Sequence, residues 1–262
     1  MQILILGGSG RTGQLIISEA LARGHGVTAL VRNPSSFSCP DPSVPVSAAS
    51  TTKKGTATAV PTISSHPNLT LVRGTPLSAP DMDGAFIAAP TPTEAVVVAL
   101  NARRVSDSPF SAPSPDTPPR MMADSVANAR AAMRRHRDGN GNWRCRLVVM
   151  SSSGAGSSFA GLNCLMKGVF THTNMHLQLD DHNAVEAETR ADFEGEGEKG
   201  PGFVFVRPAM LADGPAAPVK AYPDDGKGAG FLPKITRASV ANFIVDAVEE
   251  SEFVGRSPVI TN

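Results

Sequence analysis

The chain alternates between short apolar runs and longer amphipathic stretches. The apolar runs are rich in Val, Ile and Leu and are bounded by glycine, proline or polar residues, a pattern typical of strands buried in a parallel sheet. They lie at residues 2–6, 27–31, 68–73, 95–100, 147–150, 203–207 and 257–261, the last of which is expected to be an edge strand.

Between these runs, apolar residues recur at the spacing of a helix. One amphipathic stretch follows the glycines of 7–13 and ends at Gly24, and others cover 121–136, 178–193 and 236–248. Strands that alternate with helices predict an α/β fold, in which a Rossmann-type doubly wound parallel sheet carries helices on both faces. The length fits a single domain over residues 1–262.

Three segments interrupt the alternation and are predicted to be loop insertions. Residues 35–67 consist mostly of Ser, Thr, Pro and Ala and lack the apolar periodicity needed to bury a face, which predicts a flexible insertion. Residues 106–119 and 155–178 are predicted to be loops near the substrate, where they would govern substrate choice.

Composition narrows the classes of partner. The 262 residues contain 24 Lys and Arg and 24 Asp and Glu, so the net charge is +0 and provides no long-range field for nucleic acid or an anionic membrane. The three cysteines form no CxxC pair, so neither a metal site nor a disulfide framework is indicated. No apolar run could span a bilayer and the first residues resemble a strand rather than a signal peptide, so we expect a cytoplasmic protein.

A glycine-rich turn, GGSGRTG at residues 7–13, joins the first strand to the first helix. Glycines at 7, 10 and 13 let the backbone approach a pyrophosphate, and the helix N-terminus supplies free N–H groups and the positive end of a dipole. Because this turn lies between a predicted strand and a predicted helix, it indicates dinucleotide binding rather than a tight turn without a ligand.

The end of the second strand bears on the choice of dinucleotide. NAD-binding chains usually place a carboxylate there for the ribose 2′-OH, whereas this chain continues with Arg32 and Asn33. Arg32 would form a charge-assisted contact with a 2′-phosphate, and Arg11 could add a second positive group. The sequence therefore favours NADP(H).

The catalytic pair of ordinary short-chain dehydrogenases, a tyrosine with a lysine four residues later, is absent. The only tyrosine is Tyr222, and Gly226 stands four residues after it. A G-x-S-x-G nucleophile elbow is absent too, which disfavours a hydrolase. Candidate polar groups are the serines at 151–153, at the end of a predicted strand, and the histidines that follow them at positions 172, 176 and 182. His25 and His136, near helix ends, are expected to be solvated.

Several segments together resemble atypical short-chain dehydrogenases. They are GGSGRTG, VTALVRNP, SVANARAAM, LVVMSSSGAG, and LDDHNAVEAE followed by FVRPAMLADGP. The chain is similar to NmrA-like NAD(P)-binding proteins and, more closely, to the biliverdin-IXβ reductase and flavin reductase group. The resemblance implies a Rossmann fold that binds NADP(H) and a small-molecule substrate.

The resemblance also implies a set of site residues. Ser152 and His182 would be the active-site residues. The cofactor would be bound by Gly7, Ser9, Gly10, Arg11, Thr12, Gly13, Arg32, Leu100, Asn101, Arg103 and Pro208. The chain departs from the group at Asn101, where the group has glycine, and at Met210, where the flavin reductases have a histidine. The expectation is an intact cofactor site beside a rebuilt substrate site.

The predicted function is that of an NADP(H)-dependent oxidoreductase, which transfers a hydride to or from a small conjugated or carbonyl substrate. Ser152 would orient the substrate or the nicotinamide carboxamide, and His182 would position the substrate or relay a proton. Two alternatives stay open. One is a non-redox isomerase, rearrangement or cyclisation enzyme on an NADP-binding scaffold, and the other is an NmrA-like binding protein that senses the dinucleotide.

Overall fold

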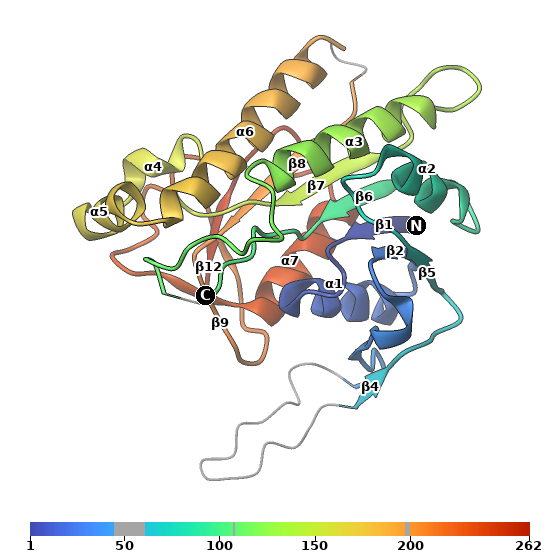
Figure 1. The fold of residues 1–262 in the computed structure, drawn as a ribbon, viewed down its shortest axis with the longest axis horizontal. Helices are drawn as coiled ribbons and strands as arrows, with labels where there is room; N and C mark the ends of the chain where they lie inside the picture. Colours follow the sequence, from blue (N-terminus) through green and yellow to red (C-terminus); the bar gives the residue numbers. More distant parts are fainter. Residues whose placement is uncertain (45–60, 107, 197–199) are drawn as a thin grey trace.

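The structure, a computed structural model, describes residues 1–44, 61–106, 108–196 and 200–262. Within these residues an eight-stranded sheet has the order β10-β12-β8-β7-β6-β1-β2-β5 (Figure 1). Its neighbouring strands are parallel except for β10 and β12. The strands are β1 Gln2–Leu6, β2 Gly26–Val31, β5 Leu69–Arg73, β6 Ala95–Val98, β7 Arg146–Met150, β8 Phe203–Pro208, β10 Lys220–Tyr222 and β12 Val259–Thr261. The predicted doubly wound parallel sheet in a single domain is confirmed.

The central strands are apolar on both faces, and this pattern places helices on both sides of the sheet. Ile3 and Ile5 of β1 belong to one apolar cluster, together with residues of α1 (Arg11–Ala22) and α7 (Arg237–Glu249). Leu4 and Leu6 belong to the other cluster. That second layer is formed by α2 (Ala79–Ile87), α3 (Met121–Arg135) and α6 (Met175–Glu194). Each fully buried aliphatic side chain contributes about 1.5–3 kcal/mol to folding.

Several elements were not expected from the sequence. The segment 155–178, predicted to be a loop, instead forms α4 (Ser158–Gly161), α5 (Cys164–His172) and the first turn of α6. Helix α2 was missed because Pro80 and Gly84 weaken its helical signal. The strands β9 (Met210–Ala212), β10 and β11 (Lys234–Thr236) are too short to show an alternating pattern. As β10 pairs beyond β12, the final strand is not the edge strand that was predicted.

The predicted insertion 35–67 is anchored to the domain at both described ends. A short 3-10 helix, η1 (Pro34–Ser36), leads to β3 (Cys39–Pro40), which pairs with β4 (Thr62–Ile63). Phe37 and Cys39 are buried in the same apolar cluster as α1. The expectation that this segment buries nothing is therefore wrong for its first residues, and residues 45–60 lie outside the described part. The described residues of 106–119 are irregular, as predicted.

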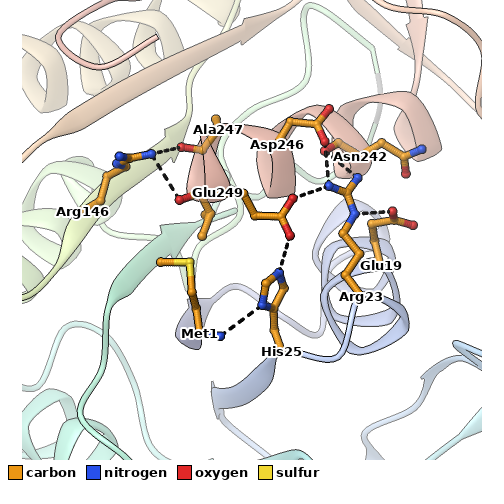
Figure 2. A network of polar contacts seen from close by, with 10 residues as sticks. Met1, Glu19, Arg23, His25, Arg146, Asn242, Asp246, Ala247 and Glu249 are labelled. Atoms are coloured by element: carbon orange, nitrogen blue, oxygen red, sulfur yellow. Dashed lines mark hydrogen bonds and ion pairs between the residues drawn. The ribbon is translucent and has the colours of Figure 1, made fainter. Parts of the chain in front are cut away.

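A network of polar contacts joins the ends of α1 and α7, which lie side by side (Figures 1 and 2). Arg23 donates to Glu19 at 2.8 Å, to Asp246 at 2.6 Å and to Glu249 at 2.7 Å. His25 Nε2 lies 2.8 Å from Glu249, and the His25 side chain is buried. The expectation of a solvated His25 is wrong, because the chain folds back so that β2 begins against this network.

On the opposite face, α3 and α6 are joined by a buried carboxylate. Asp181 of α6 accepts hydrogen bonds from the backbone N–H groups of Met122 and Ala123, both at 2.9 Å, in the first turn of α3. It therefore caps a helix other than its own, and it interacts favourably with the dipole of that helix. Burial raises the pKa of the Asp181 carboxyl, and the two N–H groups oppose this shift. The contact fixes the rotation of α6 and with it the direction of the next residue, His182.

Asp181→Ala is expected to destabilise the protein by about 1–2 kcal/mol, because two N–H groups at the start of α3 lose their acceptor. The matched control is Asp180→Ala, which removes an exposed carboxylate from the preceding position and should change stability by less than about 0.5 kcal/mol. Urea unfolding of the two variants measures the difference. Equal losses in both variants would contradict the capping role.

Candidate active site

The glycine-rich turn takes the conformation that a dinucleotide requires. Gly7 has a φ of +86°, and a Cβ atom there would lie 2.5 Å from the carbonyl oxygen of Ala99, at the end of β6. A side chain at Gly13 would collide with the backbone of Gly7. The turn therefore packs backbone against backbone at both positions, which only glycine allows.

The helix that follows the turn has an open N-terminus. Gly10 is the N-cap of α1, and among the described residues no side chain caps the helix and no acidic residue lies in its first turn. Ser9, Gly10 and Arg11 are exposed. The strand order reverses between β1 and β6, so the turn lies at the topological switch point of the sheet. Free N–H groups and a helix dipole at this point fit the pyrophosphate of a dinucleotide.

Positive side chains gather near the end of β2. Arg32 is exposed and directly follows β2. Arg73, the last residue of β5, is also exposed, and it pairs with Val31, the last residue of β2. Arg103 lies 3.5 Å from the Asp116 carboxylate. A hydrogen bond from the Ser114 hydroxyl, with smaller contributions from Arg103 and Arg32, lowers the pKa of Asp116. The loop after β6 thus brings Arg103 and Asp116 toward Arg32, and the sequence analysis had not singled out Arg73 or Asp116.

Arg11 has a different partner from the one expected. Its guanidinium lies 2.5 Å from the carboxylate of Asp213, which also accepts from Arg237 at 2.7 Å. Asp213 follows β9, so this ion pair joins the glycine-rich turn to the segment after β8. The structure thus offers Arg11 a carboxylate partner, and its proposed contact with a 2′-phosphate stays a prediction.

A cavity of about 560 Å³ lies at the carboxyl ends of the strands, next to the glycine-rich turn. Leu100 and Asn101 after β6, Ser152 after β7, and Pro208 at the end of β8 line it. His182 lines it from α6. The cavity therefore brings together five of the predicted site residues, while the glycine-rich turn, Arg32 and Arg103 lie outside it. The segments 158–179 and 208–233 contribute most of its remaining wall.

His182 is a buried histidine with an unused hydrogen-bonding atom. Its side chain is only 4% exposed, and Nδ1 has no hydrogen-bond partner among the described residues. Burial lowers the pKa of His182 to about 4, so the ring is neutral at pH 7. An unpaired buried nitrogen costs about 1–3 kcal/mol. A neutral imidazole can donate or accept a hydrogen bond, but it is not a source of imidazolium protons. Of the three clustered histidines, His172 and His176 are exposed and do not line the cavity.

A buried ion pair supports the serines at the end of β7. Arg207 Nε donates to Glu186 Oε1 at 3.0 Å, and both side chains are almost fully buried. Ser151 donates to the same oxygen at 2.8 Å. Arg207 also donates to Ser157 and to the carbonyl of Asp224 in the loops around the cavity. Ser152, in contrast, lines the cavity, and its one side-chain hydrogen bond among the described residues goes to the adjacent carbonyl of Ser153 at 3.2 Å.

The sequence analysis missed the roles of Glu186 and Arg207. The one available signal was an unpaired arginine inside an apolar strand together with a glutamate one helical turn after His182. Each of these residues alone is also typical of a solvated surface. Within the described part of the chain, no group of three His, Cys, Asp or Glu side chains is placed to hold a metal ion, and no helix is long and apolar enough to cross a membrane.

His182→Gln tests the buried neutral state through the pH dependence of stability. The folded pKa of about 4 lies below the unfolded value of about 6.5, so the unfolded chain binds the proton more tightly. The contribution of neutral His182 to the free energy of unfolding is therefore fully present above about pH 6.5, and it falls by roughly 3 kcal/mol as the pH decreases to 4. The free energy of unfolding of His182→Gln should therefore decrease less on acidification than that of the parent protein, whereas that of His172→Gln should decrease as in the parent. Chemical unfolding at pH 7 and 4.5 measures the effect, and parallel curves for His182→Gln and the parent would contradict it.

Comparison with solved structures shows that the chain has a Rossmann-like α/β fold. An anaerobillin reductase from Escherichia coli O157:H7 is 14% identical, with a TM-score of 0.62 and coverage of 100% of this chain and 97% of that one. A Rossmann-fold NAD(P)-binding family protein from Shigella flexneri is 16% identical, with a TM-score of 0.61 and coverage of 100% and 93%. The oxidoreductase from Lactococcus lactis is 13% identical, with a TM-score of 0.61 and coverage of 100% and 91%. These likenesses show the fold. No curated protein matches the chain.

A protein family described as NAD(P)H-binding matches residues 7–60 and 54–251, which together include the glycine-rich turn and the cavity-lining residues except Val259. The match covers most of the chain and agrees with the open helix terminus at the switch point. The chain belongs to this NAD(P)H-binding family.

Proposed function

We propose that the protein is an NADP(H)-dependent oxidoreductase that transfers a hydride to or from a small conjugated or carbonyl substrate, as in the flavin reductase and biliverdin-IXβ reductase group. The observation that carries the proposal is the continuity of two sites. The glycine-rich turn packs against the end of β6 at Ala99 and Leu100, and Leu100 is already part of the wall of the cavity. A dinucleotide on the turn would present its nicotinamide to the cavity, where Ser152 and His182 lie.

The preference for NADP(H) over NAD(H) rests on charge. Arg32 and Arg73 lie at the ends of two neighbouring strands, and Arg103 approaches from the loop after β6. A 2′-phosphate could accept charge-assisted hydrogen bonds from these guanidinium groups. The carboxylate of Asp116 lies 3.5 Å from the guanidinium of Arg103, so it would compete with the 2′-phosphate for Arg103.

The residues of the cavity have separate chemical roles. The bound reduced cofactor would supply one hydrogen with two electrons, and the oxygen of the substrate would gain a proton that comes from solvent. Ser152 can donate to the substrate oxygen or accept from the carboxamide. Neutral His182 can donate one hydrogen bond to the same oxygen, where negative charge develops. Of the two roles predicted for His182, this favours positioning the substrate over donating a proton from an imidazolium ion, because a ring with a pKa of about 4 is neutral at pH 7.

Arg32→Ala is expected to weaken NADPH binding by about 10- to 100-fold and to leave NADH binding nearly unchanged, because only NADPH carries the 2′-phosphate. Isothermal titration calorimetry with NADPH, NADP⁺, NADH and NAD⁺ measures both. The matched control is Arg144→Ala, an exposed arginine before β7 at the other end of the sheet, which should change neither affinity. Asp116→Asn should raise NADPH affinity a few-fold, because it removes the competing carboxylate. Equal loss of NADPH and NADH affinity in Arg32→Ala would contradict the assignment.

Turnover distinguishes the oxidoreductase from its alternatives. NADPH oxidation is followed by absorbance with a panel of flavins, quinones and small carbonyl compounds. His182→Gln and Ser152→Ala should each lower kcat by about 10²-fold, because each removes a hydrogen bond that strengthens as charge develops. NADPH affinity should be unchanged in His182→Gln. His176→Gln, on the exposed side of α6, is the control. Product formation without loss of NADPH would favour the non-redox enzyme, and tight binding without any turnover would favour the dinucleotide sensor.

A further inference from the structure

We propose that the cavity is built for an uncharged, largely apolar substrate, and that it rejects substrates with phosphate, sulfonate or carboxylate groups. The inference rests on the proposed function, because it assigns a substrate class to the same site. It follows from the chemistry of the cavity wall, which is mostly apolar and has one charged side chain among the described residues.

The wall is apolar over most of its extent. Met166, Val169 and Phe170 contribute from α5, and Leu179 contributes from α6. Phe231 and Leu232 close the cavity from the loop before β11, and both are exposed in this structure, Phe231 by 64%. Large apolar side chains that remain this exposed at the rim of a cavity gain stability when an apolar ligand covers them.

Charged groups are nearly absent from the wall. Among the described residues, Arg104 is the one side chain there that is charged at pH 7, and no carboxylate lines the cavity. One Nη of Arg104 already donates to the carbonyl of Ser108 at 2.9 Å. An anionic substituent in the cavity would therefore find one partly engaged guanidinium at the rim, and a cationic one would find no counter-ion. Burying a charge without a partner is strongly unfavourable.

The polar residues of the wall are mostly paired with one another. Gln178 donates to Asn101, and Asn163 donates to the carbonyl of Phe231. Apart from Arg104, the remaining polar side chains of the wall are uncharged, namely serine hydroxyls, amides and the buried ring of His182, whose Nδ1 has no partner among the described residues. Such groups can form hydrogen bonds with a carbonyl or hydroxyl, but they cannot neutralise an ionised substituent. A cavity with many apolar contacts and uncharged polar groups therefore fits a conjugated ring ketone or quinone better than a molecule with several ionised groups.

The experiment compares probes that differ in charge. One pair is 2-methyl-1,4-naphthoquinone and 1,4-naphthoquinone-2-sulfonate, and the other is riboflavin and FMN, which differ by a phosphate. With the full chain and saturating NADPH, the neutral member of each pair should have a kcat/KM at least about tenfold higher, since it buries no unpaired charge. Equal or higher kcat/KM for the charged members would overturn the inference while the proposed oxidoreductase function stands.

A pair of lysine substitutions tests the wall itself. Met166→Lys places a cation on the cavity side of α5. It should lower the ratio of kcat/KM for the neutral quinone to kcat/KM for the sulfonated quinone by about tenfold. Leu177→Lys places the same charge on an exposed position of α6 outside the wall, and it should leave the ratio unchanged. Lysine has a high helix propensity and both positions are helical, so thermal unfolding should show that both variants fold. An equal decrease of this kcat/KM ratio in both variants would contradict the inference that the cavity wall sets the preference for neutral substrates.

Binding without turnover separates this inference from the proposed function. Equilibrium dialysis measures the affinity of the two quinones and two flavins for the protein saturated with NADP⁺, where no reduction takes place. Preferential binding of the neutral probes with no NADPH oxidation would support the inference and contradict the oxidoreductase function. Absence of binding by all four probes, with NADPH oxidation by small charged carbonyl compounds, would overturn the inference and leave the function standing.

Discussion

Burial of β1 and β6 on both faces is the constraint on which the rest of the structure depends. The residues of both strands are almost completely inaccessible, and alternate side chains of β1 enter the two separate apolar clusters. Helices must therefore cover both faces of the sheet, and the chain must leave the two strands in opposite directions. The gap between those exits is where the glycine-rich turn, the end of β6 and the cavity meet. Every site residue discussed above is positioned by an element that starts or ends at this edge.

Helix α6 connects the stability of this arrangement to its chemistry. Three residues of α6, between positions 181 and 186, contact different parts of the structure. Asp181 caps α3, His182 lines the cavity, and Glu186 holds Arg207 and Ser151 below the strand ends. A helix that is held at both sides of His182 leaves the imidazole little freedom to rotate. The buried Glu186–Arg207 pair is costly to assemble but strongly unfavourable to break, so it favours this one geometry of the cavity loops.

The distribution of charge separates the two ends of the site. Arginines gather near the end of β2, where a dinucleotide would place its adenosine, and the cavity at the nicotinamide end is nearly free of ionised groups. A low-dielectric cavity strengthens the few hydrogen bonds that it offers. It also keeps His182 neutral, because desolvation disfavours the imidazolium ion. The same apolar surroundings that desolvate the histidine thus select against ionised substrates.

The sequence by itself determined the parallel sheet, its helices on both faces and the glycine-rich turn. These features follow from local patterns: apolar runs, helical periodicity and glycines at fixed spacing, all of which neighbouring residues specify. The choice of Ser152 and His182 as site residues came from the resemblance to a family. Only the tertiary structure decided that Asp181 caps another helix, that His25 is buried, that Arg11 faces Asp213 and that residues 158–161 and 164–172 form helices. These two short helices pack in a small apolar cluster of their own beside the cavity, and contacts with distant residues such as Leu179 stabilise them. Contacts between residues that lie tens to hundreds of positions apart depend on how the layers pack, and no local pattern carries that information.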